Sequence, residues 1–272
     1  MKRILAILAT LTLTLSTALA QGWQQSPPHP IQQCVQHSPW GFAESRQQLQ
    51  PLCRTGYLSA YDAAAKIPNW VAYTLQPQNA LGCQPRGNDF VADRSVKDGA
   101  RPEDYTGTGY DRGHAAPDGD LAWSEHTQRE SYLMTNMYPQ AGSLNRGAWK
   151  LLETSIRGWA VQQGAPYTIY VGAVYSPQDK TIGRGVVVPS TYYKIVVNGR
   201  TGQIAGWSFP HRQPYPNLGN DLTKLRAPVK DIMALSGVTF KFPPGAVEVP
   251  PGSEWPVNYG ALTDSKRNTC KK

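Results

Sequence analysis

Two stretches decide the fold of this chain: Asp111-Arg112-Gly113-His114, and the segment from Asn136 to Glu153. In the first stretch a histidine follows an arginine by two residues, and Gly113 between them lets the backbone turn tightly and approach a ligand. The second stretch reads Asn136-Met137-Tyr138-Pro139-Gln140 and, after a short gap, Asn145-Arg146-Gly147-Ala148-Trp149-Lys150-Leu151-Leu152-Glu153. An imidazole beside a fixed cation is therefore followed by a run of amides and charged side chains.

From about Leu144 onward the second stretch has the spacing of an amphipathic helix. Its core-facing stripe recurs every three or four residues, at Trp149, Leu152, Ile156 and Ala160. The sequence Gln162-Gln163-Gly164 supplies a stop. Asn145, Glu153 and Arg157 fall along a neighbouring stripe, so this helix is expected to align a neutral oxygen ligand, an acid and a cation.

The order Asp-Arg-Gly-His, then Asn-x-x-Pro-Gln, then Asn-x-x-x-Trp with a glutamate farther along the helix, resembles the DNA/RNA non-specific endonucleases. The catalytic core of that family is the ββα-metal, or His-Me, finger. The resemblance covers roughly Trp70 to Leu235 and is sharpest between Asp111 and Arg157. It implies an α+β fold in which a mixed, mainly antiparallel sheet is flanked by helices and carries a ββα-metal finger active site.

The N-terminus has the features of a secretory signal peptide. Met1-Lys2-Arg3 is basic, the stretch from Ile4 to Leu19 is apolar, and Ala18-Leu19-Ala20 ends it in small-x-small form. Cleavage is expected after Ala20, which would make residues 1–20 a signal peptide and place the mature protein outside the cell or in the periplasm. An uncleaved membrane anchor is the weaker alternative, because the run is short and contains Thr and Ser. No other stretch is expected to span a bilayer.

The charge of the mature chain is consistent with a polyanionic partner. The formal net charge of the full chain is +8. Loss of Lys2 and Arg3 leaves 25 basic and 19 acidic residues, a net charge of +6. The alternative is a basic surface that only keeps the protein soluble.

Four cysteines in an exported chain indicate two disulfides. Zinc binding is not expected, because no Cys-x-x-Cys pair is present. Three pairings are possible. The one we favour joins Cys34 to Cys53 and Cys83 to Cys270, which would tie an N-terminal arm to itself and the tail to the body.

Residues 21–55 are rich in Gln, Pro and Ser and are expected to form this disulfide-tethered, irregular arm. Residues 56–272 show neither an internal repeat nor a linker, so a single endonuclease domain is expected there. Its predicted elements are a helical turn within Tyr57–Lys66, a strand at Trp70–Leu75, a helix at Glu125–Met134, a central strand at Tyr167–Tyr175, a hairpin of Tyr192–Val197 and Gln203–Phe209 around Asn198-Gly199, a helix at Pro228–Leu235 and a short strand at Val238–Phe242 before a Pro-rich tail.

Hydrolysis of a phosphodiester requires a base to deprotonate water and positive charge to stabilise the phosphorane. His114 is the candidate base, because imidazole titrates near neutrality and the neighbouring Arg112 favours its neutral form. A histidine buried for packing is the alternative. Asn145 is the candidate metal ligand, since a neutral amide oxygen suits Mg²⁺, or Mn²⁺, and leaves the full charge of the ion to act on the phosphate. A helix-capping role for Asn145 is an alternative compatible with metal binding.

Further side chains are expected to support the metal and the loop that carries it. Glu153 corresponds to a family position that hydrogen-bonds metal-bound waters, and otherwise would be a surface acid that pairs with Arg157. Asn136 resembles a family position near the metal and would either orient these waters or brace the loop. Asp111 is expected to fix the loop, whereas Tyr132 stands where some family members have an asparagine.

Cations complete the predicted site. Arg112 and Arg157 suit bidentate contacts to phosphate oxygens, which would supply most of the transition-state stabilisation. The family has a phosphate-binding arginine ahead of an aromatic residue and an acid, and the best match is Arg86 before Phe90 and Asp93.

Four further residues of the second stretch have predicted roles. Arg146 and Lys150, four residues apart, are expected to follow the nucleic-acid backbone, which carries no sequence information. Gln140 and Trp149 are interpreted as scaffold.

The resemblance implies a secreted, Mg²⁺-dependent phosphodiester hydrolase, an endonuclease that cleaves DNA and RNA and leaves 5′-phosphates. One alternative is a catalytically silent nucleic-acid-binding relative of the same fold, although such a relative tends to lose His114 or Asn145. Another is a phosphodiesterase acting on a small or lipid substrate, which no basic amphipathic helix in the sequence supports.

Overall fold

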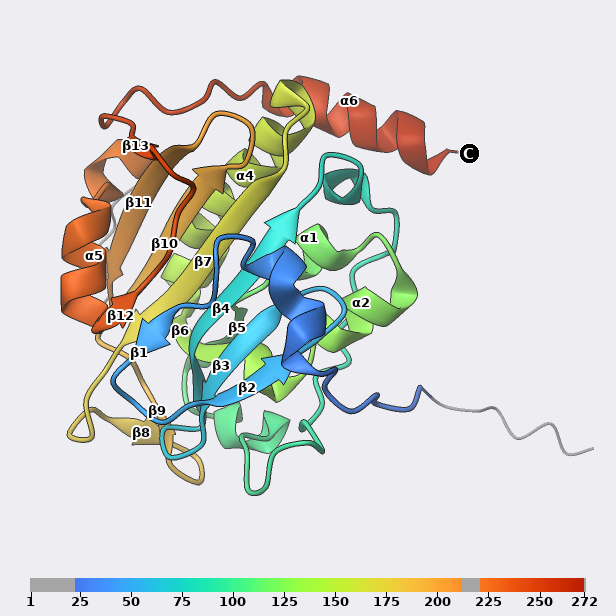
Figure 1. The fold of residues 1–272 in the computed structure, drawn as a ribbon. Coiled ribbons are helices and arrows are strands. Elements are labelled where there is room, and N and C mark those ends of the chain that lie inside the picture. The colour runs from blue at the N-terminus through green and yellow to red at the C-terminus, as the bar shows by residue number, and fades with distance from the viewer. Residues whose placement is uncertain (1–22, 212–220, 272) are drawn as a thin grey trace, which may run out of the picture.

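A seven-stranded sheet, with strand order β13-β11-β10-β7-β4-β3-β2, runs through the middle of the molecule (Figure 1). The computed structural model describes residues 23–211 and 221–271, so the predicted signal peptide, residues 1–20, lies outside the described residues. Neighbouring strands of this sheet are antiparallel except β11 and β13, which are parallel. The predicted α+β class with a mixed, mainly antiparallel sheet is confirmed.

The strands of this sheet are β2 (Gln50–Cys53), β3 (Leu58–Asp62), β4 (Ile67–Leu75), β7 (Tyr167–Val174), β10 (Thr191–Asn198), β11 (Gln203–Pro210) and β13 (Val247–Glu248). Three smaller pairs in the described residues join β1 (Glu44–Ser45) to β12 (Val238–Thr239), β5 (Tyr110–His114) to β6 (Met137–Ala141) and β8 (Thr181–Ile182) to β9 (Val186–Val187). The α-helices are α1 (Asp118–Leu121), α2 (Glu125–Ser131), α3 (Gly142–Leu144), α4 (Lys150–Gln163), α5 (Val229–Ser236) and α6 (Tyr259–Cys270). The 3₁₀ turns are η1 (Ile31–His37), η2 (Asn79–Leu81), η3 (Pro102–Tyr105), η4 (Met134–Asn136) and η6 (Leu222–Leu225), and a wider turn, η5 (Asn145–Trp149), precedes α4.

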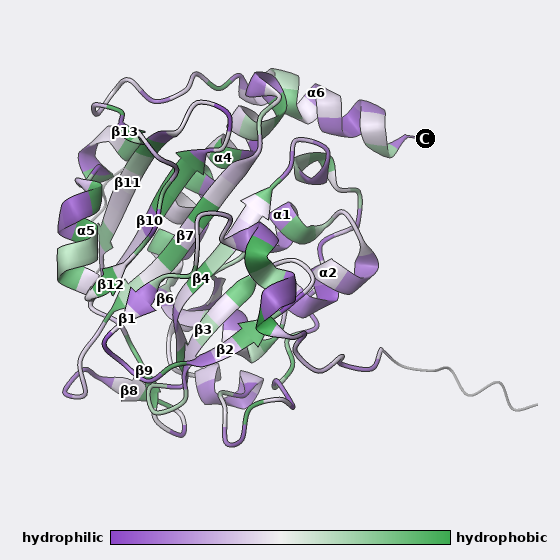
Figure 2. Ribbon diagram, viewed as in Figure 1, coloured by the Kyte–Doolittle hydropathy of each residue, from purple (hydrophilic) through white to green (hydrophobic). Residues whose placement is uncertain are grey.

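The central position predicted for the strand at Tyr167–Tyr175 is confirmed. β7 pairs with β4 on one side and β10 on the other, and its first seven residues are buried. Its near-apolar sequence suits a strand covered on both faces, and hydrophobic residues prevail along β7 and β10 in Figure 2. The predicted Asn-Gly hairpin is also confirmed, because β10 and β11 pair across residues 199–202.

The two faces of the sheet are covered by different helices. Alternate residues of β10, such as Tyr192 and Val196, pack in the same core as the predicted stripe of α4, whereas Tyr193 and Ile195 pack in the same core as α5. All four members of the α4 stripe, Trp149, Leu152, Ile156 and Ala160, are buried. α4 therefore rests on one face of the sheet, and its other side is free to build a site.

The prediction of a helical turn within Tyr57–Lys66 is wrong. Leu58–Asp62 is a strand paired with β4, and the turn that follows places Lys66 at a positive φ of 58°. Residues Leu58 to Tyr61 are all buried, so pairing in the sheet outweighs weak local preference.

Two other segments are more regular than predicted. The arm, residues 21–55, contributes η1 and the edge strand β2, so it joins the sheet and is not irregular throughout. The Pro-rich tail ends in a twelve-residue helix, α6. The helices expected at Glu125–Met134 and Pro228–Leu235 are present as α2 and α5. The short strand expected at Val238–Phe242 is present as β12.

Both favoured disulfides are present. Cys34 is bonded to Cys53, and Cys83 is bonded to Cys270. The first ties η1 to the edge strand β2, and the second ties the end of α6 to the loop that follows η2. Among residues 23–211 and 221–271 no helix is long and apolar enough to cross a bilayer.

Candidate active site

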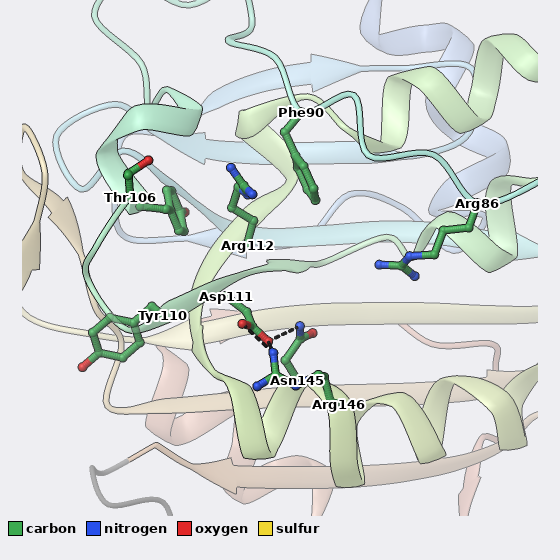
Figure 3. Close-up of a pocket in the computed structure, with 9 residues that line it drawn as sticks. Arg86, Phe90, Thr106, Tyr110, Asp111, Arg112, Asn145 and Arg146 are labelled. Carbon is green, nitrogen blue, oxygen red and sulfur yellow. Dashed lines mark hydrogen bonds and ion pairs between the residues drawn. The ribbon is translucent and has the colours of Figure 1, made fainter.

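The predicted active-site residues lie on β5, on the η5 turn, on α4 and on the loop that contains Arg86. They line two adjoining pockets that share Arg86, Asn145 and Arg146 and therefore form one cleft. The first pocket also contains Phe90, Tyr110 and Arg112, whose side chains are drawn with the shared residues in Figure 3. The second pocket also contains His114, Pro117, Asp118, Gly119, Lys150, Glu153 and Arg157.

β5, β6 and α4 form the ββα unit that holds this cleft. β5 pairs antiparallel with β6, with Gly113 opposite Tyr138 and His114 opposite Met137. The tight turn predicted at Gly113 is wrong, because this residue lies within a strand. It must be small for a different reason, since a Cβ there would lie 2.1 Å from the buried side-chain oxygen of Gln140. The scaffold role of Gln140 therefore consists of filling the space that Gly113 leaves.

The predicted helix is interrupted just where the site begins. Gly147 has non-helical backbone angles, φ −101° and ψ −116°, so the chain bends between η5 and the regular helix α4. Asn145 lies before this bend and Glu153 after it, yet both line the same pocket. The bend therefore keeps the two side chains on the cleft side.

His114 is buried at the floor of the cleft with 7% of its surface exposed. Burial, together with the positive charges of Arg86 and Lys194, lowers its pKa from 6.5 to about 3. Its Nε2 atom has no hydrogen-bond partner among the described residues. The indole N–H of Trp149 donates to the backbone oxygen of His114 at 3.3 Å, which anchors the strand end. The imidazole is thus neutral at neutral pH, as a base must be.

Asn145 is oriented by Asp111. The Asn145 side-chain amide donates to Asp111 Oδ2 at 3.0 Å, and the same carboxylate accepts from Arg146 Nη1 at 2.6 Å (Figure 3). Because the amide nitrogen is held by a carboxylate, the Asn145 carbonyl oxygen is left to face another partner. The alternative of a helix cap is wrong, because the N-cap residues of α3 and η5 are Ala141 and Leu144, and the Asn145 side chain bonds to Asp111 instead.

The donor set of the cleft suits a hard divalent ion that keeps most of its waters. Among the described residues no group of three or more His, Cys, Asp or Glu side chains is arranged to hold a metal. The cleft instead offers the Asn145 oxygen, with the carboxylate of Glu153 lining the same pocket. A single neutral oxygen ligand, supported by a carboxylate that accepts hydrogen bonds from waters, fits Mg²⁺.

Lys194 on β10 is a residue of the site that sequence reasoning missed. Its fully buried ammonium lies 3.3 Å from Glu153 Oε1 and 4.2 Å above the ring of Trp149. Burial raises the pKa of Glu153, and the charge of Lys194 opposes this rise. The expectation that Glu153 would otherwise be a surface acid paired with Arg157 is wrong, because its ion-pair partner is Lys194. The only sequence signal was a lysine inside an apolar strand.

The cations of the cleft fall into two groups. Arg157 pairs with the buried Asp120 at 2.7 Å, and Arg146 pairs with Asp111. Arg86, Arg112 and Lys150 form no ion pair with any described residue; the guanidinium of Arg112 lies 4.5 Å from the ring centre of Phe90. Unpaired arginines that line a polar cleft are available for an anionic ligand.

Two residues brace the loop beside His114. The side chain of Asn136 bonds to the backbone N–H of Ala116 at 2.9 Å and to the carbonyls of Ala116 and Ser131 at 2.8 and 2.9 Å. Of its two predicted roles, these contacts correspond to the brace. The hydroxyl of Tyr132 lies 2.9 Å from Asp118 Oδ1, so the tyrosine connects to the cleft through a carboxylate.

This fold and cleft, with a neutral histidine, an oriented amide oxygen and unpaired arginines on a ββα unit, define a phosphodiester hydrolase. Comparison with known families gives a match between residues 40–245 and the family described as DNA/RNA non-specific endonuclease. The chain belongs to this family.

Curated relatives are nucleases from distant organisms. A nuclease of Nostoc sp. is 31% identical over 203 residues, which cover 70% of this chain and 72% of the relative. Nuclease 1, mitochondrial, of Schizosaccharomyces pombe is 29% identical over 208 residues, which cover 67% of this chain and 63% of that protein. Human Endonuclease G, mitochondrial, is 27% identical over 202 residues, with 69% and 68% covered.

A solved structure shares the fold. A chain in the crystal structure of the EndoG/EndoGI complex superposes with a TM-score of 0.63 at 23% identity and covers 76% of this chain and 91% of its own. The predicted fold is thereby confirmed, and β5, β6 and α4 supply its ββα unit.

Proposed function

We propose that this protein is an exported endonuclease that uses Mg²⁺, or Mn²⁺, to cleave DNA and RNA and leaves 5′-phosphate ends. The observation that carries the proposal is that His114 and Asn145, distant in sequence, line one pocket together with the unpaired Arg86. Had the fold placed them on opposite sides of the body, they could not act on the same phosphate. The basic surface of the mature chain suits a polyanionic substrate of either sugar type.

His114 acts as the general base in this proposal. The neutral imidazole takes a proton from a water whose oxygen attacks the phosphorus. The bond to the 3′ oxygen then breaks on the opposite side, and the leaving 3′ oxygen takes up a proton from solvent. The phosphate thereby stays on the 5′ oxygen of the downstream fragment, and the upstream fragment ends in a 3′-hydroxyl. Arg86 and Arg112 hold the phosphate oxygens, while Arg157 contributes charge from its fixed position against Asp120.

Asn145 would hold the divalent ion, and Glu153 would accept hydrogen bonds from its waters. When bound, the ion supplies positive charge to the scissile phosphate and to the leaving oxygen. Asp111 keeps the Asn145 amide turned so that its oxygen, and not its nitrogen, is offered to the ion. The positive charge of Lys194 favours the charged form of the buried Glu153. Arg146 and Lys150 lie farther along the cleft and follow the backbone of the substrate.

The decisive experiment incubates plasmid DNA and total RNA with the exported protein, with Mg²⁺ or with EDTA. N-terminal sequencing of that protein is expected to begin at Gln21. The wild type should degrade both substrates only with the metal. His114→Ala and Asn145→Ala should each lower kcat by about 10²- to 10⁴-fold, the usual contribution of a general base or an essential charge-stabilising group. A DNA ligase should join the DNA fragments without prior phosphorylation, because the ligase requires 5′-phosphate ends.

Lys230→Gln on α5 serves as the control in this assay, because α5 covers the opposite face of the sheet from α4. Plasmid left intact by the wild type in Mg²⁺ would instead identify a silent nucleic-acid-binding relative. Full activity of His114→Ala would remove the proposed base.

A further inference from the structure

The C-terminal helix α6 lies beyond the family match, which ends at residue 245, and yet it is fixed firmly against the active-site helix. The hydroxyls of Tyr259 and Ser155 lie 2.9 Å apart. Gln162 on α4 donates to the backbone oxygen of Asn258 at 2.7 Å and accepts from its backbone N–H at 2.9 Å. At the other end of α6 the Cys83–Cys270 disulfide closes the attachment. Figure 1 shows α6 starting beside the end of α4 and extending away from it to the C-terminal end of the described chain.

The inner face of α6 carries a lysine. Leu262, Lys266 and Cys270 follow one another at intervals of four residues; Leu262 is buried and Cys270 is bonded to the body. Lys266 therefore faces the body of the protein, where it is half-buried and forms no ion pair with a described residue. A half-buried ammonium group without a carboxylate partner is available to bind an anionic ligand.

The surroundings of Lys266 belong to the cleft. Burial lowers its pKa most, the positive charge of Arg157 lowers this pKa further, and the carboxylates of Asp118 and Asp120 oppose the change. Arg157 and Asp118 both line the pocket that holds His114. Arg157 is already paired with Asp120. The positive charges of Arg157 and Lys266 nevertheless lie within electrostatic reach of each other. An anion that lies near both cations stabilises such an arrangement.

We propose that Lys266 binds a backbone phosphate of the nucleic acid beyond the scissile phosphate, and that α6, held by the Cys83–Cys270 disulfide, forms one wall of the substrate-binding surface. This inference rests on the proposed function. Arg146, Lys150 and Arg157 line the pocket that holds His114, and α6, which carries Lys266, packs against α4 beside them. A backbone contact of this kind strengthens binding to long substrates of any sequence and leaves the chemical step unchanged.

Binding is tested without cleavage, in full-length His114→Ala protein with EDTA. Fluorescence anisotropy gives the Kd for a long duplex and for a dinucleotide at several salt concentrations. The parent is compared with three variants of it that carry, in addition, Lys266→Gln, Lys266→Arg or Lys230→Gln. We expect Lys266→Gln to raise Kd for the duplex about tenfold, the value of one charge-assisted contact. It should lower the slope of log Kd against log salt by about one. Lys266→Arg should bind like the parent.

Lys230→Gln removes the same charge from the opposite side of the sheet and should leave Kd unchanged. A Lys266→Gln variant that behaves like Lys230→Gln, or that weakens dinucleotide binding as much as duplex binding, would overturn the proposal. Failure of the proposed function would be detected separately, in the cleavage assay, where the wild-type protein would leave plasmid intact in Mg²⁺.

The role of the disulfide has its own test. The double variant Cys83→Ser, Cys270→Ser should raise the duplex Kd about as much as Lys266→Gln does. Adding Lys266→Gln to this double variant should change the Kd little, because the disulfide and the lysine both act through α6. A folded double-serine protein that binds as tightly as the parent would show that the disulfide is not required to place Lys266.

Discussion

At the scale of single residues, the charge balance of the cleft depends on a lysine in the middle of a strand. Lys194 is fully buried, pairs with Glu153 and lies over the ring of Trp149. Removing one partner of a buried ion pair leaves the other charge uncompensated. Burial lowers the pKa of Lys194, whereas the carboxylate of Glu153 raises it, so each partner maintains the charge of the other.

Replacing Lys194 by methionine keeps the volume and removes the charge. The pKa of Glu153, already raised by burial, should rise further, so its carboxyl becomes protonated closer to neutrality. We expect kcat to fall about 10- to 100-fold, as for loss of a group that supports a metal site. Part of this loss should be recovered as the pH of the assay is raised.

Stability should also fall by about 3 kcal/mol, measured by urea unfolding. Lys230→Met on α5 is the matched control and should change neither quantity. A Lys194→Met enzyme with an unchanged pH–rate profile would show that Lys194 is only structural.

At the scale of elements, two helices meet through a second buried ion pair. Asp120 on α1 is 1% exposed and accepts from Arg157 on α4 at 2.7 Å and from the hydroxyl of Tyr73 on β4 at 2.8 Å. One carboxylate thereby connects α1, α4 and the central sheet. This connection fixes the direction in which Arg157 faces the cleft.

Asp120→Asn should disrupt that connection. The two carboxylate oxygens accept from two different donors, and the amide would direct an N–H group toward one of them. We expect a loss of about 3 kcal/mol in the free energy of unfolding and a higher KM for nucleic acid, because Arg157 loses its anchor. Tyr73→Phe removes one donor but keeps the charge, and should cost only about 1 kcal/mol. Equal losses for the two variants would contradict the ion-pair explanation.

At the scale of the whole molecule, buried histidines couple stability to pH. Burial lowers the pKa of His37 to about 4 and that of His114 to about 3, and the pKa of His211 is lowered for the same reason. Below pH 6.5 the unfolded chain binds more protons at these sites than the folded protein. Stability is therefore lost as the pH falls from 6.5 toward these folded-state pKa values. Glu130 and Glu153, whose pKa values are raised, act in the opposite direction.

His37, at the end of η1 in the arm, allows one part of this effect to be tested. Its Nε2 atom lies 3.1 Å from the backbone oxygen of Thr55, and glutamine can still donate to that oxygen. Between about pH 7 and about pH 5, we expect the free energy of unfolding to fall by about 2 kcal/mol more in the wild type than in His37→Gln. Urea unfolding at the two pH values measures the difference. Parallel losses in the two proteins would show that His37 does not titrate on unfolding.

Much of the fold and of the site follows from local sequence patterns. The stripe of α4, the apolar run of β7 and the Asn-Gly turn each reflect a periodicity or a backbone preference within a few residues. The residues from Asp111 to Arg157 likewise contain most of the cleft, because β5, β6 and α4 all lie within residues 110–163. The segment Tyr57–Lys66 was misjudged because sheet pairing decided its conformation.

The sequence by itself determined the family, the ββα unit and the candidate pair His114 and Asn145. Only the tertiary structure decided which cations are already paired, that Lys194 pairs with Glu153, and that α6 packs against α4. The physical reason is separation along the chain. Lys194 is 41 residues from Glu153, and Cys83 is 187 residues from Cys270, so no local pattern relates the members of either pair. Burial and long-range pairing assign those roles, and both depend on the assembled sheet.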